Sequence, residues 1–479
     1  MLWLSLYLPD LPLDLLGRGT SEPEHPLLIQ DGPSQRPVVY ACNGAACQAG
    51  IMPGMGLGAA HSLSPELRVH VRDPQAETEA LEGVAAWAGQ FTSRVVLQPP
   101  AGLLLEIEGS LTLFGGLAAL RARILQGLRE LGYTVAPAIA PTPLGSWLLA
   151  RAGQPQEILE ISHLHSVLRK LPITTLERSA HLIQALRGMG VQTVNDCLHL
   201  PRDGLARRLG PELVQYLDRA LGRIPDPRPA YRAPPRFQRR LVLPAEVDST
   251  EALGFAARRL LLELSGFLRG RGCGIQNLTL DLGHRQRPPS RLTLGLVRPS
   301  RDTEHLTRLL RERLEHHALA APVDELVLRA DRLIPLEEDS RNLFRHPEST
   351  AQDWPQLVER LQARLGVKAV RGLCPLPDHR PERAWRFCTP GETGTTVTHP
   401  RRPVWLLETP KPLPVSEGAP WLDGRLRFES GPERIESGWW DDMDVARDYF
   451  IAENPRHERF WVYRERRAPE RWFLHGVFG

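Results

Sequence analysis

The chain has 479 residues, of which 42% are hydrophobic and 24% are charged, and its net charge is +3. This globular composition excludes collagen-like, coiled-coil and low-complexity proteins, and the length predicts three or four domains. No apolar run reaches the roughly 18 residues that a membrane span needs. The apolar start is interrupted by Pro9, Asp10, Pro12 and Asp14, which is not typical of a signal peptide. We therefore expect a cytoplasmic protein that does not bind membranes.

The cysteines are scattered along the chain, and none forms a C-x-x-C pair. This spacing favours reduced structural thiols over a zinc site, so no metal and no cofactor is expected. The six are Cys42, Cys47, Cys197, Cys273, Cys374 and Cys388.

Positive charge is concentrated in one part of the chain. Residues 1–150 carry 8 Arg and 13 acidic residues, whereas residues 236–313 carry 15 Arg and 8 acidic residues, a net charge of +7. Local positive charge attracts polyanions even when the whole chain is near neutral. Residues 236–313 are therefore a candidate nucleic-acid surface, with a solvated charged face as the open alternative.

The first 150 residues alternate between strand and helix patterns. Apolar residues at helical spacing predict a helix within Leu111–Leu131, and Thr142 can cap a helix over Pro143–Ala152. Such alternation predicts an α/β layer with a covered sheet. The strand-like segments are Leu2–Leu8, Arg36–Ala41, Val95–Leu97, Leu103–Ile107 and Tyr133–Ile139.

Short helices separated by Pro and Gly follow from about residue 165 to residue 225. The clearest pair, Ala180–Leu186 and Thr193–Leu200, is joined by a turn that contains Gly188 and Gly190. This unit resembles a helix–hairpin–helix, in which glycines let backbone N–H groups approach a phosphate. Gly188, Gly190 and Thr193 are therefore candidate DNA-binding residues, and an ordinary helical corner remains open. A second pair is predicted at Asp203–Leu209 and Glu212–Leu221.

Five prolines within residues 225–235 indicate a linker. The order of elements after it predicts a four-stranded sheet with two helices on one face and an open second face. Its strands are Arg239–Leu243, Gln276–Leu282, Ser290–Leu296 and Glu325–Leu333, and its helices are Thr250–Arg269 and Thr303–Leu319. The arginines on or beside these strands, expected on the open face, are Arg236, Arg239, Arg240, Arg285, Arg287 and Arg291.

The last 130 residues are rich in proline and aromatic residues. Phe460–Tyr463 and Trp472–Leu474 have the pattern of a β-hairpin.

The order of these pieces resembles that of the Y-family translesion DNA polymerases. Gly50–Ala60 lies where that family has its fingers helix, and Leu105–Ser110 with Leu113–Gly115 is similar to the palm strand and the turn after it. Val135–Pro141 with Pro143-Leu144 is similar to the step from strand to helix before the thumb. The resemblance implies an α+β multidomain fold: palm and fingers (1–164), helix–hairpin–helix thumb (165–224), Pro-rich linker (225–235), little finger with a four-stranded sheet and two helices (236–336), second linker (337–349) and aromatic-rich, β-containing C-terminal region (350–479).

The same resemblance implies where catalytic carboxylates should stand. Two-metal phosphoryl transfer needs clustered carboxylates, and catalytic members of the family have one Asp on the first palm strand and an Asp-Glu pair on the later one. These positions correspond to Tyr7, Ala101 and Gly102, none of which is acidic. The Tyr and Arg that hold the triphosphate in the family correspond to Asn43 and Ala46. The resemblance thus implies a palm without catalytic residues.

A palm of this kind joined to a basic thumb and little finger resembles the polymerase-like accessory subunits of bacterial mutagenic translesion systems. The ending Arg471–Phe478 is similar to theirs. This implies a nucleoid-associated scaffold that binds DNA, the sliding clamp, an error-prone C-family DNA polymerase and a RecA-like protein. The family's clamp-binding peptide has a Gln followed by Leu-Phe; here Leu343 and Phe344 are present but Ser340 replaces the Gln, and an ordinary loop Leu-Phe remains open. The partner polymerase is expected to dock on residues 350–479, including Trp461, Trp472 and Phe473.

Two other classes of function remain open from the sequence. One is an active nucleotidyltransferase that uses Asp10, Asp14 or Glu106 in a rearranged metal site. The other is a protein adaptor whose basic face meets an acidic partner. Primer extension would distinguish an active nucleotidyltransferase from a scaffold. Failure to bind any DNA at low salt would favour the protein adaptor.

Overall fold

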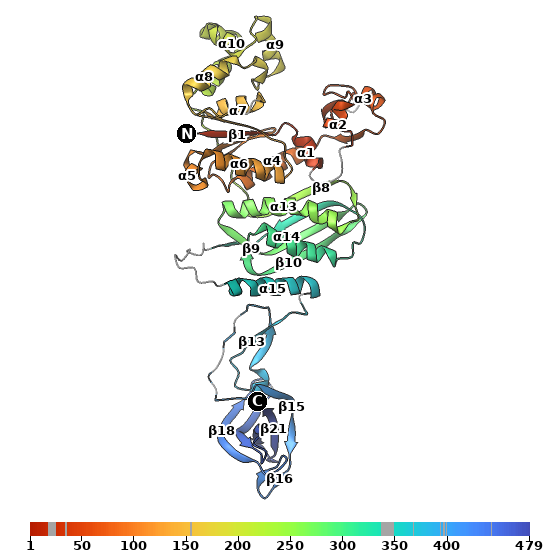
Figure 1. Cartoon of the computed structure of the whole chain (residues 1–479), viewed down its shortest axis with the longest axis vertical. Coiled ribbons are helices and arrows are strands. Elements are labelled where there is room, and N and C mark those ends of the chain that lie inside the picture. The colour runs from red at the N-terminus through yellow and green to blue at the C-terminus, as the bar shows by residue number, and fades with distance from the viewer. Residues whose placement is uncertain are drawn as a thin grey trace. The chain divides into compact units, whose positions relative to one another are not determined.

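The structure is a computed structural model of the whole chain (Figure 1). It describes residues 1–17, 25–33, 36–153, 156–336, 349–366, 368–392, 394–395, 398, 400–441 and 443–479. The chain divides into two compact units, Met1–Arg364 (unit 1) and Leu365–Gly479 (unit 2), and each is described by itself. Within the described residues, no helix has both the length and the apolar character needed to cross a membrane.

A four-stranded antiparallel sheet, in the order β5-β6-β1-β7, forms the palm. Alternation along β1 sends Leu4 and Leu6 toward α4 and α6, and Trp3 and Tyr7 toward α7, so both faces are covered, as predicted. The elements are β1 (Trp3–Tyr7), α1 (Leu11–Gly17), α4 (Pro74–Ala88), β5 (Val95–Gln98), β6 (Gly102–Glu106), α5 (Leu111–Phe114), α6 (Leu117–Glu130), β7 (Ala136–Ala140) and α7 (Pro143–Arg151).

The fingers form a small three-stranded sheet with two short helices, and here one prediction is wrong. Helix α3 begins only at Leu57, because Gly50 and Gly54 both adopt positive φ (+89° and +88°), which a helix cannot contain. The segment Gly50–Gly56 is therefore a loop. The elements are β2 (Leu27–Asp31), β3 (Val38–Cys42), α2 (Gly44–Gln48), α3 (Leu57–Leu63) and β4 (Arg68–Val71).

The thumb is helical throughout, and both predicted helix pairs are present. It packs on the palm through α12 and α8, which contact α7. Its helices are α8 (Ile161–Lys170), α9 (Ala180–Gly188), α10 (Val194–His199), α11 (Arg202–Leu209) and α12 (Pro211–Ala220).

The little finger contains all six predicted elements, with strand order β10-β9-β11-β8 and β12 added beside β9. Helices α13 and α14 cover one face of the sheet (Figure 1). The elements are β8 (Phe237–Val247), α13 (Thr250–Gly270), β9 (Cys273–His284), β10 (Arg287–Ser300), α14 (Thr303–Glu315), β11 (Val323–Ala330) and β12 (Leu333–Pro335).

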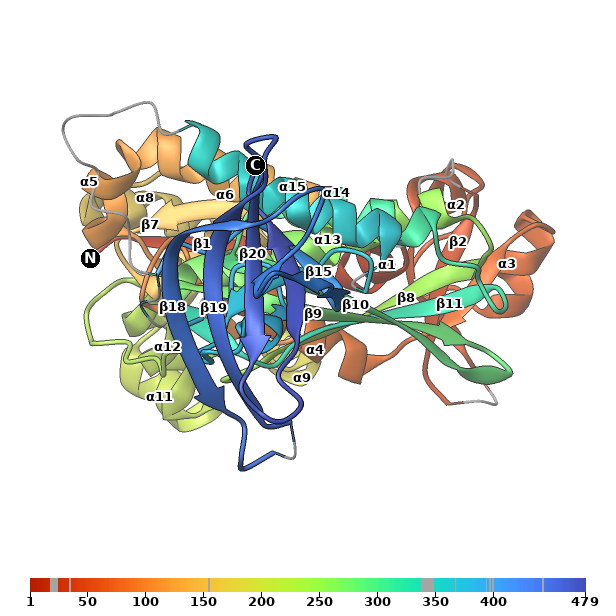
Figure 2. The same cartoon turned by 90° about the horizontal axis from the view of Figure 1, so that it is seen from below.

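A further helix, α15 (Ser349–Leu365), also packs on the little finger, although the sequence pattern did not predict it. It lies beside α14 (Figure 2), where the buried Glu359 bonds to His305 at 2.6 Å and accepts from the Val297 amide at 2.7 Å. The region after residue 350 therefore starts with a helix of unit 1.

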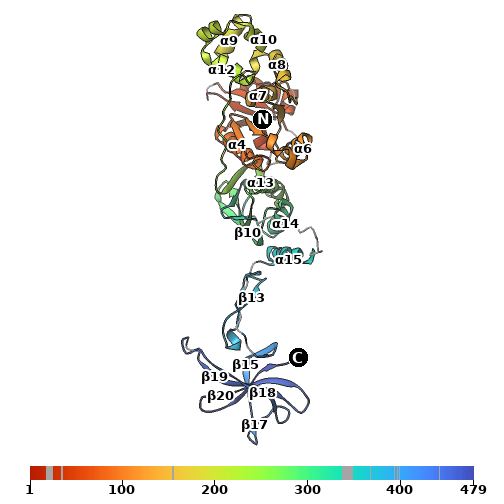
Figure 3. The ribbon, with the colours of Figure 1, turned by 90° about the vertical axis from the view of Figure 1, so that its left-hand side faces the viewer.

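Unit 2 contains a five-stranded antiparallel sheet, in the order β15-β21-β20-β19-β18, and two separate two-stranded sheets, β13-β14 and β16-β17 (Figure 3). The predicted hairpin of aromatic strands is confirmed as β20 and β21. The elements are β13 (Gly372–Pro375), β14 (Trp385–Cys388), β15 (Trp405–Leu413), β16 (Val415–Ser416), β17 (Ala419–Pro420), β18 (Arg427–Ser437), β19 (Val445–Glu453), β20 (Arg459–Glu465) and β21 (Trp472–Val477).

Candidate functional site

The three positions expected to carry carboxylates lie together at one end of the palm sheet. Tyr7 is the cross-strand partner of Gly102, and the Leu8 amide donates to the Ala101 carbonyl at 2.9 Å. The fold thus brings these positions side by side, as a two-metal site would require. Their side chains are a phenol, a methyl group and a hydrogen atom, and none of these ligates Mg²⁺.

Trp147 of α7 fills the space beside these positions. Its ring is buried and packs edge-on against Tyr7, with ring centroids 5.5 Å apart. Its Nε1 donates to the Glu177 carboxylate at 3.1 Å. A methyl group added at Gly102 would overlap the outer edge of the indole. An aromatic side chain therefore stands where a carboxylate at residue 102 would project, and sequence reasoning missed it because a Trp on an apolar helix face looks like any core residue.

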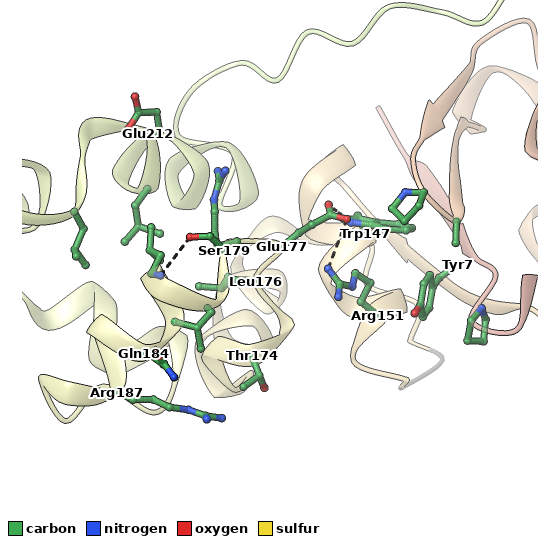
Figure 4. A pocket seen from close by; sticks show the side chains of 18 of the residues that line it. Tyr7, Trp147, Arg151, Thr174, Leu176, Glu177, Ser179, Gln184, Arg187 and Glu212 are labelled. Atoms are coloured by element: carbon green, nitrogen blue, oxygen red, sulfur yellow. Dashed lines mark hydrogen bonds and ion pairs between the residues drawn. The ribbon is translucent and has the colours of Figure 1, made fainter. Parts of the chain in front are cut away.

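A cleft of about 1000 Å³ opens between this end of the palm and the thumb. Figure 4 shows Tyr7 and Trp147 on the palm side, with Thr174, Gln184 and Arg187 on the thumb side. Its lining includes three Arg and three Glu residues, so positive charge does not dominate it. The six are Arg151, Arg178, Arg187, Glu77, Glu177 and Glu212.

Two of the three cleft carboxylates are held by protein groups. Glu77 forms a two-point ion pair with Arg72, with both N–O distances at 2.8 Å. Glu177 accepts from Trp147 and also from the side-chain amide of Gln98 at 3.0 Å. Each carboxylate therefore has a structural role in fixing one element against another.

The alternative metal ligands, Asp10, Asp14 and Glu106, are not brought together. Glu106 pairs with Trp3 at the far end of β6 from Gly102, roughly 14 Å along the strand at about 3.4 Å per residue. Asp14 accepts from the Thr134 amide at 2.7 Å and from its hydroxyl at 3.1 Å. Within the described part of unit 1, no group of three His, Cys, Asp or Glu side chains converges as metal ligands would.

Asn43 and Ala46, which correspond to the residues that hold the triphosphate in the polymerase family, have structural roles as well. Asn43 caps α2, since its side-chain oxygen accepts from the amides of Ala46 and Leu27, both at 3.0 Å. Ala46 is fully buried in the fingers core. Neither residue offers positive charge to a nucleotide.

The turn between α9 and α10 satisfies its own backbone groups. Gly190 has φ +81°, and its amide donates to the Arg187 carbonyl at 2.9 Å. Thr193 caps α10, and Asp196 accepts from the Thr193 and Gln192 amides at 2.9 and 3.1 Å. These backbone hydrogen bonds hold the pKa of Asp196 below its usual range. Gly188, Gly190 and Thr193 thus form the expected hairpin, but a phosphate would have to share amides that already have acceptors.

The register of the little-finger sheet decides which predicted arginines face outward. Arg240, Val327, Asp281 and Arg291 form one row across β8, β11, β9 and β10. This row lies on the face opposite the apolar core, because Leu241, Leu328, Leu280 and Leu292, the residues that follow or precede its members, are buried.

Arg239 points the other way, toward Glu263 of α13, with an N–O distance of 3.7 Å, and it is half-buried. The prediction that Arg239 belongs to the open face is therefore wrong: residues alternate along a strand, and Arg239 shares the face of Phe237 and Leu241. The other five predicted arginines, Arg236, Arg240, Arg285, Arg287 and Arg291, are exposed.

Acidic partners hold several of the exposed arginines in fixed positions. Asp281 is buried and binds Arg291, with an Nε–Oδ1 distance of 2.7 Å, and also Arg329. Arg240 pairs with Glu325 on the neighbouring strand. The guanidinium groups of the open face are thus held by ion pairs, and neighbouring carboxylates partly neutralise their positive charge.

The predicted clamp-binding residues Ser340, Leu343 and Phe344 lie outside the described residues. Of the predicted docking residues, Trp472 and Phe473 are half-buried, whereas Trp461 is 1% exposed and stacks on Tyr449 with ring centroids 4.0 Å apart. Trp461 is therefore a core residue of unit 2. The aromatic side chains that unit 2 does expose include Trp385, Trp405, Trp421, Trp439 and Trp440.

The chain is similar to known proteins in sequence and in structure. A family model described as IMS, the impB/mucB/samB family, matches residues 21–151. Protein ImuB of Caulobacter vibrioides, from strains NA1000 / CB15N and ATCC 19089, is 28% identical over 459 residues, which cover 90% of this chain and 100% of the relative.

Solved structures of DNA polymerases also match 70% of this chain and 100% of their own. They include an insertion ternary complex of Dbh DNA polymerase, at 15% identity and a TM-score of 0.40, and DinB from Sulfolobus solfataricus, at 16% identity and a TM-score of 0.39. The chain is thus similar to ImuB over 90% of its length, and its residues 21–151 match the IMS family model.

Proposed function

We propose that the chain is a noncatalytic, DNA-binding scaffold of the translesion synthesis machinery that responds to DNA damage. The observation that carries this proposal is the end of the palm sheet, where Tyr7, Ala101 and Gly102 stand together and Trp147 covers them. Two-metal catalysis needs carboxylates that hold both cations about 3.5–4 Å apart. The aromatic cluster supplies none, so we expect DNA to be held without nucleotide addition.

DNA binding is supported by the polymerase-like architecture and by the charge of residues 236–313. Arg240 and Arg291 are exposed on the sheet face opposite α13 and α14, where Arg240 also lines a cleft with residues of α1 and α4, so a duplex can approach this face. Contacts of arginine with phosphates are independent of sequence and weaken as salt increases. The proposed role of this surface is therefore to follow the backbone of primer–template DNA without reading bases.

The partners in this proposal are the sliding clamp, an error-prone C-family DNA polymerase and a RecA-like protein. Their support is the likeness of the chain to ImuB over 90% of its length, together with the Leu343-Phe344 pair after the little finger. Two apolar anchors entering a pocket can supply most of the binding energy of a peptide. We accordingly propose a nucleoid-associated scaffold that gathers these proteins on DNA.

Primer extension by the purified protein, combined with DNA binding at two salt concentrations, tests the catalytic half of the proposal. We expect binding of primer–template DNA but no extension with Mg²⁺ or Mn²⁺. Extension that disappears when Asp10, Asp14 or Glu106 is replaced would contradict the proposal and make the chain a polymerase with a rearranged metal site.

A pair of neighbouring arginines provides a matched test of the DNA surface. Arg240→Ala should weaken binding to unrelated DNA sequences equally and lower the salt slope by about 1, whereas Arg239→Ala, on the opposite face, should leave both unchanged. Equal effects of the two substitutions would remove the open face from the proposal.

The clamp contact has its own test. Leu343→Ala combined with Phe344→Ala should abolish capture of the chain by immobilised sliding clamp and leave DNA affinity unchanged. Capture that survives both substitutions would exclude this peptide as the clamp contact.

A further inference from the structure

Two thiols and a carboxylate meet at the β13–β14 hairpin of unit 2. Cys374 lies on β13, Cys388 ends β14, and Glu392 follows in the next loop. One ligand atom from each of the three lies within 4.8 Å of the other two. Cys374 is fully buried, and its Sγ donates to the Glu392 carbonyl at 3.2 Å. Sequence spacing gave no sign of this cluster, because the antiparallel pairing of β13 with β14 creates it.

The hairpin that carries these residues is tied to the rest of unit 2 through its connecting loop, where buried Arg380 pairs with Asp441 and Glu382 pairs with Arg447. Among the residues that the structure describes, β13 and β14 pair only with each other (β13 is labelled in Figure 1). Leu373 and Phe387 are more than half exposed, and neither apolar cluster of the five-stranded sheet includes a residue of this hairpin. Two paired strands alone are at best marginally stable in water, so a cross-link between them through Cys374 and Cys388 would stabilise the hairpin further.

We propose that Cys374, Cys388 and Glu392 bind a Zn²⁺ ion that cross-links the β13–β14 hairpin. Two thiolates and one carboxylate oxygen are common zinc ligands, and zinc accepts them in a tetrahedral arrangement with distances of about 2.0–2.3 Å. A water molecule would take the fourth position. Binding releases the two thiol protons, since both sulfurs coordinate as thiolates.

The neighbourhood of Glu392 supports a carboxylate that can turn toward a cation. Its side chain pairs with Arg386 and accepts weakly from the Thr389 amide at 3.4 Å. Arg386 is exposed, so one carboxylate oxygen can remain with this guanidinium while the other coordinates the metal. The ion pair would then fix the orientation of the ligand, as outer partners of metal ligands commonly do.

Metal content and cobalt spectroscopy of the full chain test this proposal. We expect about one zinc per chain after purification without chelator, and a sulfur-to-cobalt charge-transfer band in the near ultraviolet when Co²⁺ replaces it. Cys388→Ser should lose the zinc and the band, whereas the matched variant Cys273→Ser, a half-buried thiol outside the cluster, should keep both. Glu392→Gln should keep the band but bind zinc at least tenfold more weakly.

Several results would overturn the proposal. These are zinc that remains in Cys388→Ser, a reduced wild type that binds neither Zn²⁺ nor Co²⁺ at micromolar concentration, and a Cys374–Cys388 disulfide found by mass spectrometry in the protein as purified. Because Cys374→Ser removes a buried thiol and can impair folding, Cys388→Ser is the decisive variant. None of these readouts depends on DNA binding or primer extension, so they test the zinc site independently of the proposed function.

Discussion

The substitution Gly102→Ala tests whether Trp147 occupies the space where a side chain at residue 102 would project. In Gly102→Ala, the new Cβ would overlap the outer edge of the Trp147 ring and lie 3.2 Å from the Gln98 carbonyl oxygen on its other side. The strand cannot move away, because Gly102 pairs with both Tyr7 and Gln98. The ring must therefore shift.

The cost of that shift follows from what holds the ring. Trp147 donates to the charged Glu177 carboxylate, a kind of bond that contributes about 1.5–3 kcal/mol. Its edge-to-face contact with Tyr7 adds about 0.5–1.5 kcal/mol. We expect Gly102→Ala to lose most of both and to lower the free energy of local opening by about 2–4 kcal/mol, within the range of overpacking effects.

Amide hydrogen exchange of β6 measures this quantity without requiring the whole chain to unfold in one step. A loss of about 2 kcal/mol speeds exchange of the Leu103–Leu105 amides about 30-fold, since each 1.4 kcal/mol is a factor of ten. Gly109→Ala is the matched control, because a methyl group there meets no atom within 4 Å. In a Trp147→Leu background, Gly102→Ala should cost less than about 1 kcal/mol. Equal costs in both backgrounds would refute the steric argument.

Two further predictions concern ionisable groups outside the palm sheet. Arg72 pairs with Glu77 and with Asp31 at 3.1 Å, so Arg72→Met should destabilise the fingers by about 2–4 kcal/mol, seen as faster proteolysis there than in the exposed control Arg68→Met. Burial lowers the pKa of His475 to about 4, below its unfolded value of about 6.5. The buried neutral His475 therefore contributes fully to the free energy of unfolding above about pH 6.5, and this contribution is lost as the pH falls toward 4. At pH 5 the free energy of unfolding should be lower by about 2 kcal/mol. Urea midpoints should fall less between pH 7.5 and pH 5 in His475→Gln than in wild type, and equal falls would contradict the assignment.

The sequence predicted the elements whose residue patterns are local. The strands of the palm and the little finger have regular apolar spacing, and Thr142 followed by Pro143 marks the start of α7 correctly. The β20–β21 hairpin was predictable for the same reason, because Phe460–Tyr463 and Trp472–Leu474 are short apolar runs close together.

Features that depend on long-range contacts could not be predicted in this way. The register of β8 with β11 decides on which face of the sheet the Arg239 side chain lies. A strand whose exact limits are unknown does not reveal this register. Helix α15 was missed because Pro355 within it reads as a helix breaker, although its buried Glu359 finds a partner in His305. The role of Trp147 depends on Gly102, which lies 45 residues earlier in the sequence, and only the folded chain brings the two together.

These contacts bear on whether catalytic carboxylates could be introduced into this palm. Tyr7→Asp, Ala101→Asp and Gly102→Glu would return three acids to adjacent positions, but a glutamate side chain introduced at residue 102 would meet the Trp147 ring. Three carboxylates in a half-buried site also repel one another unless cations bind. At present, Tyr7 and Trp147 fill the same volume with an aromatic contact and a hydrogen bond, which stabilise the fold without metal. We therefore infer that the triple variant alone would be both unstable and inactive, and that shortening Trp147 is a further requirement.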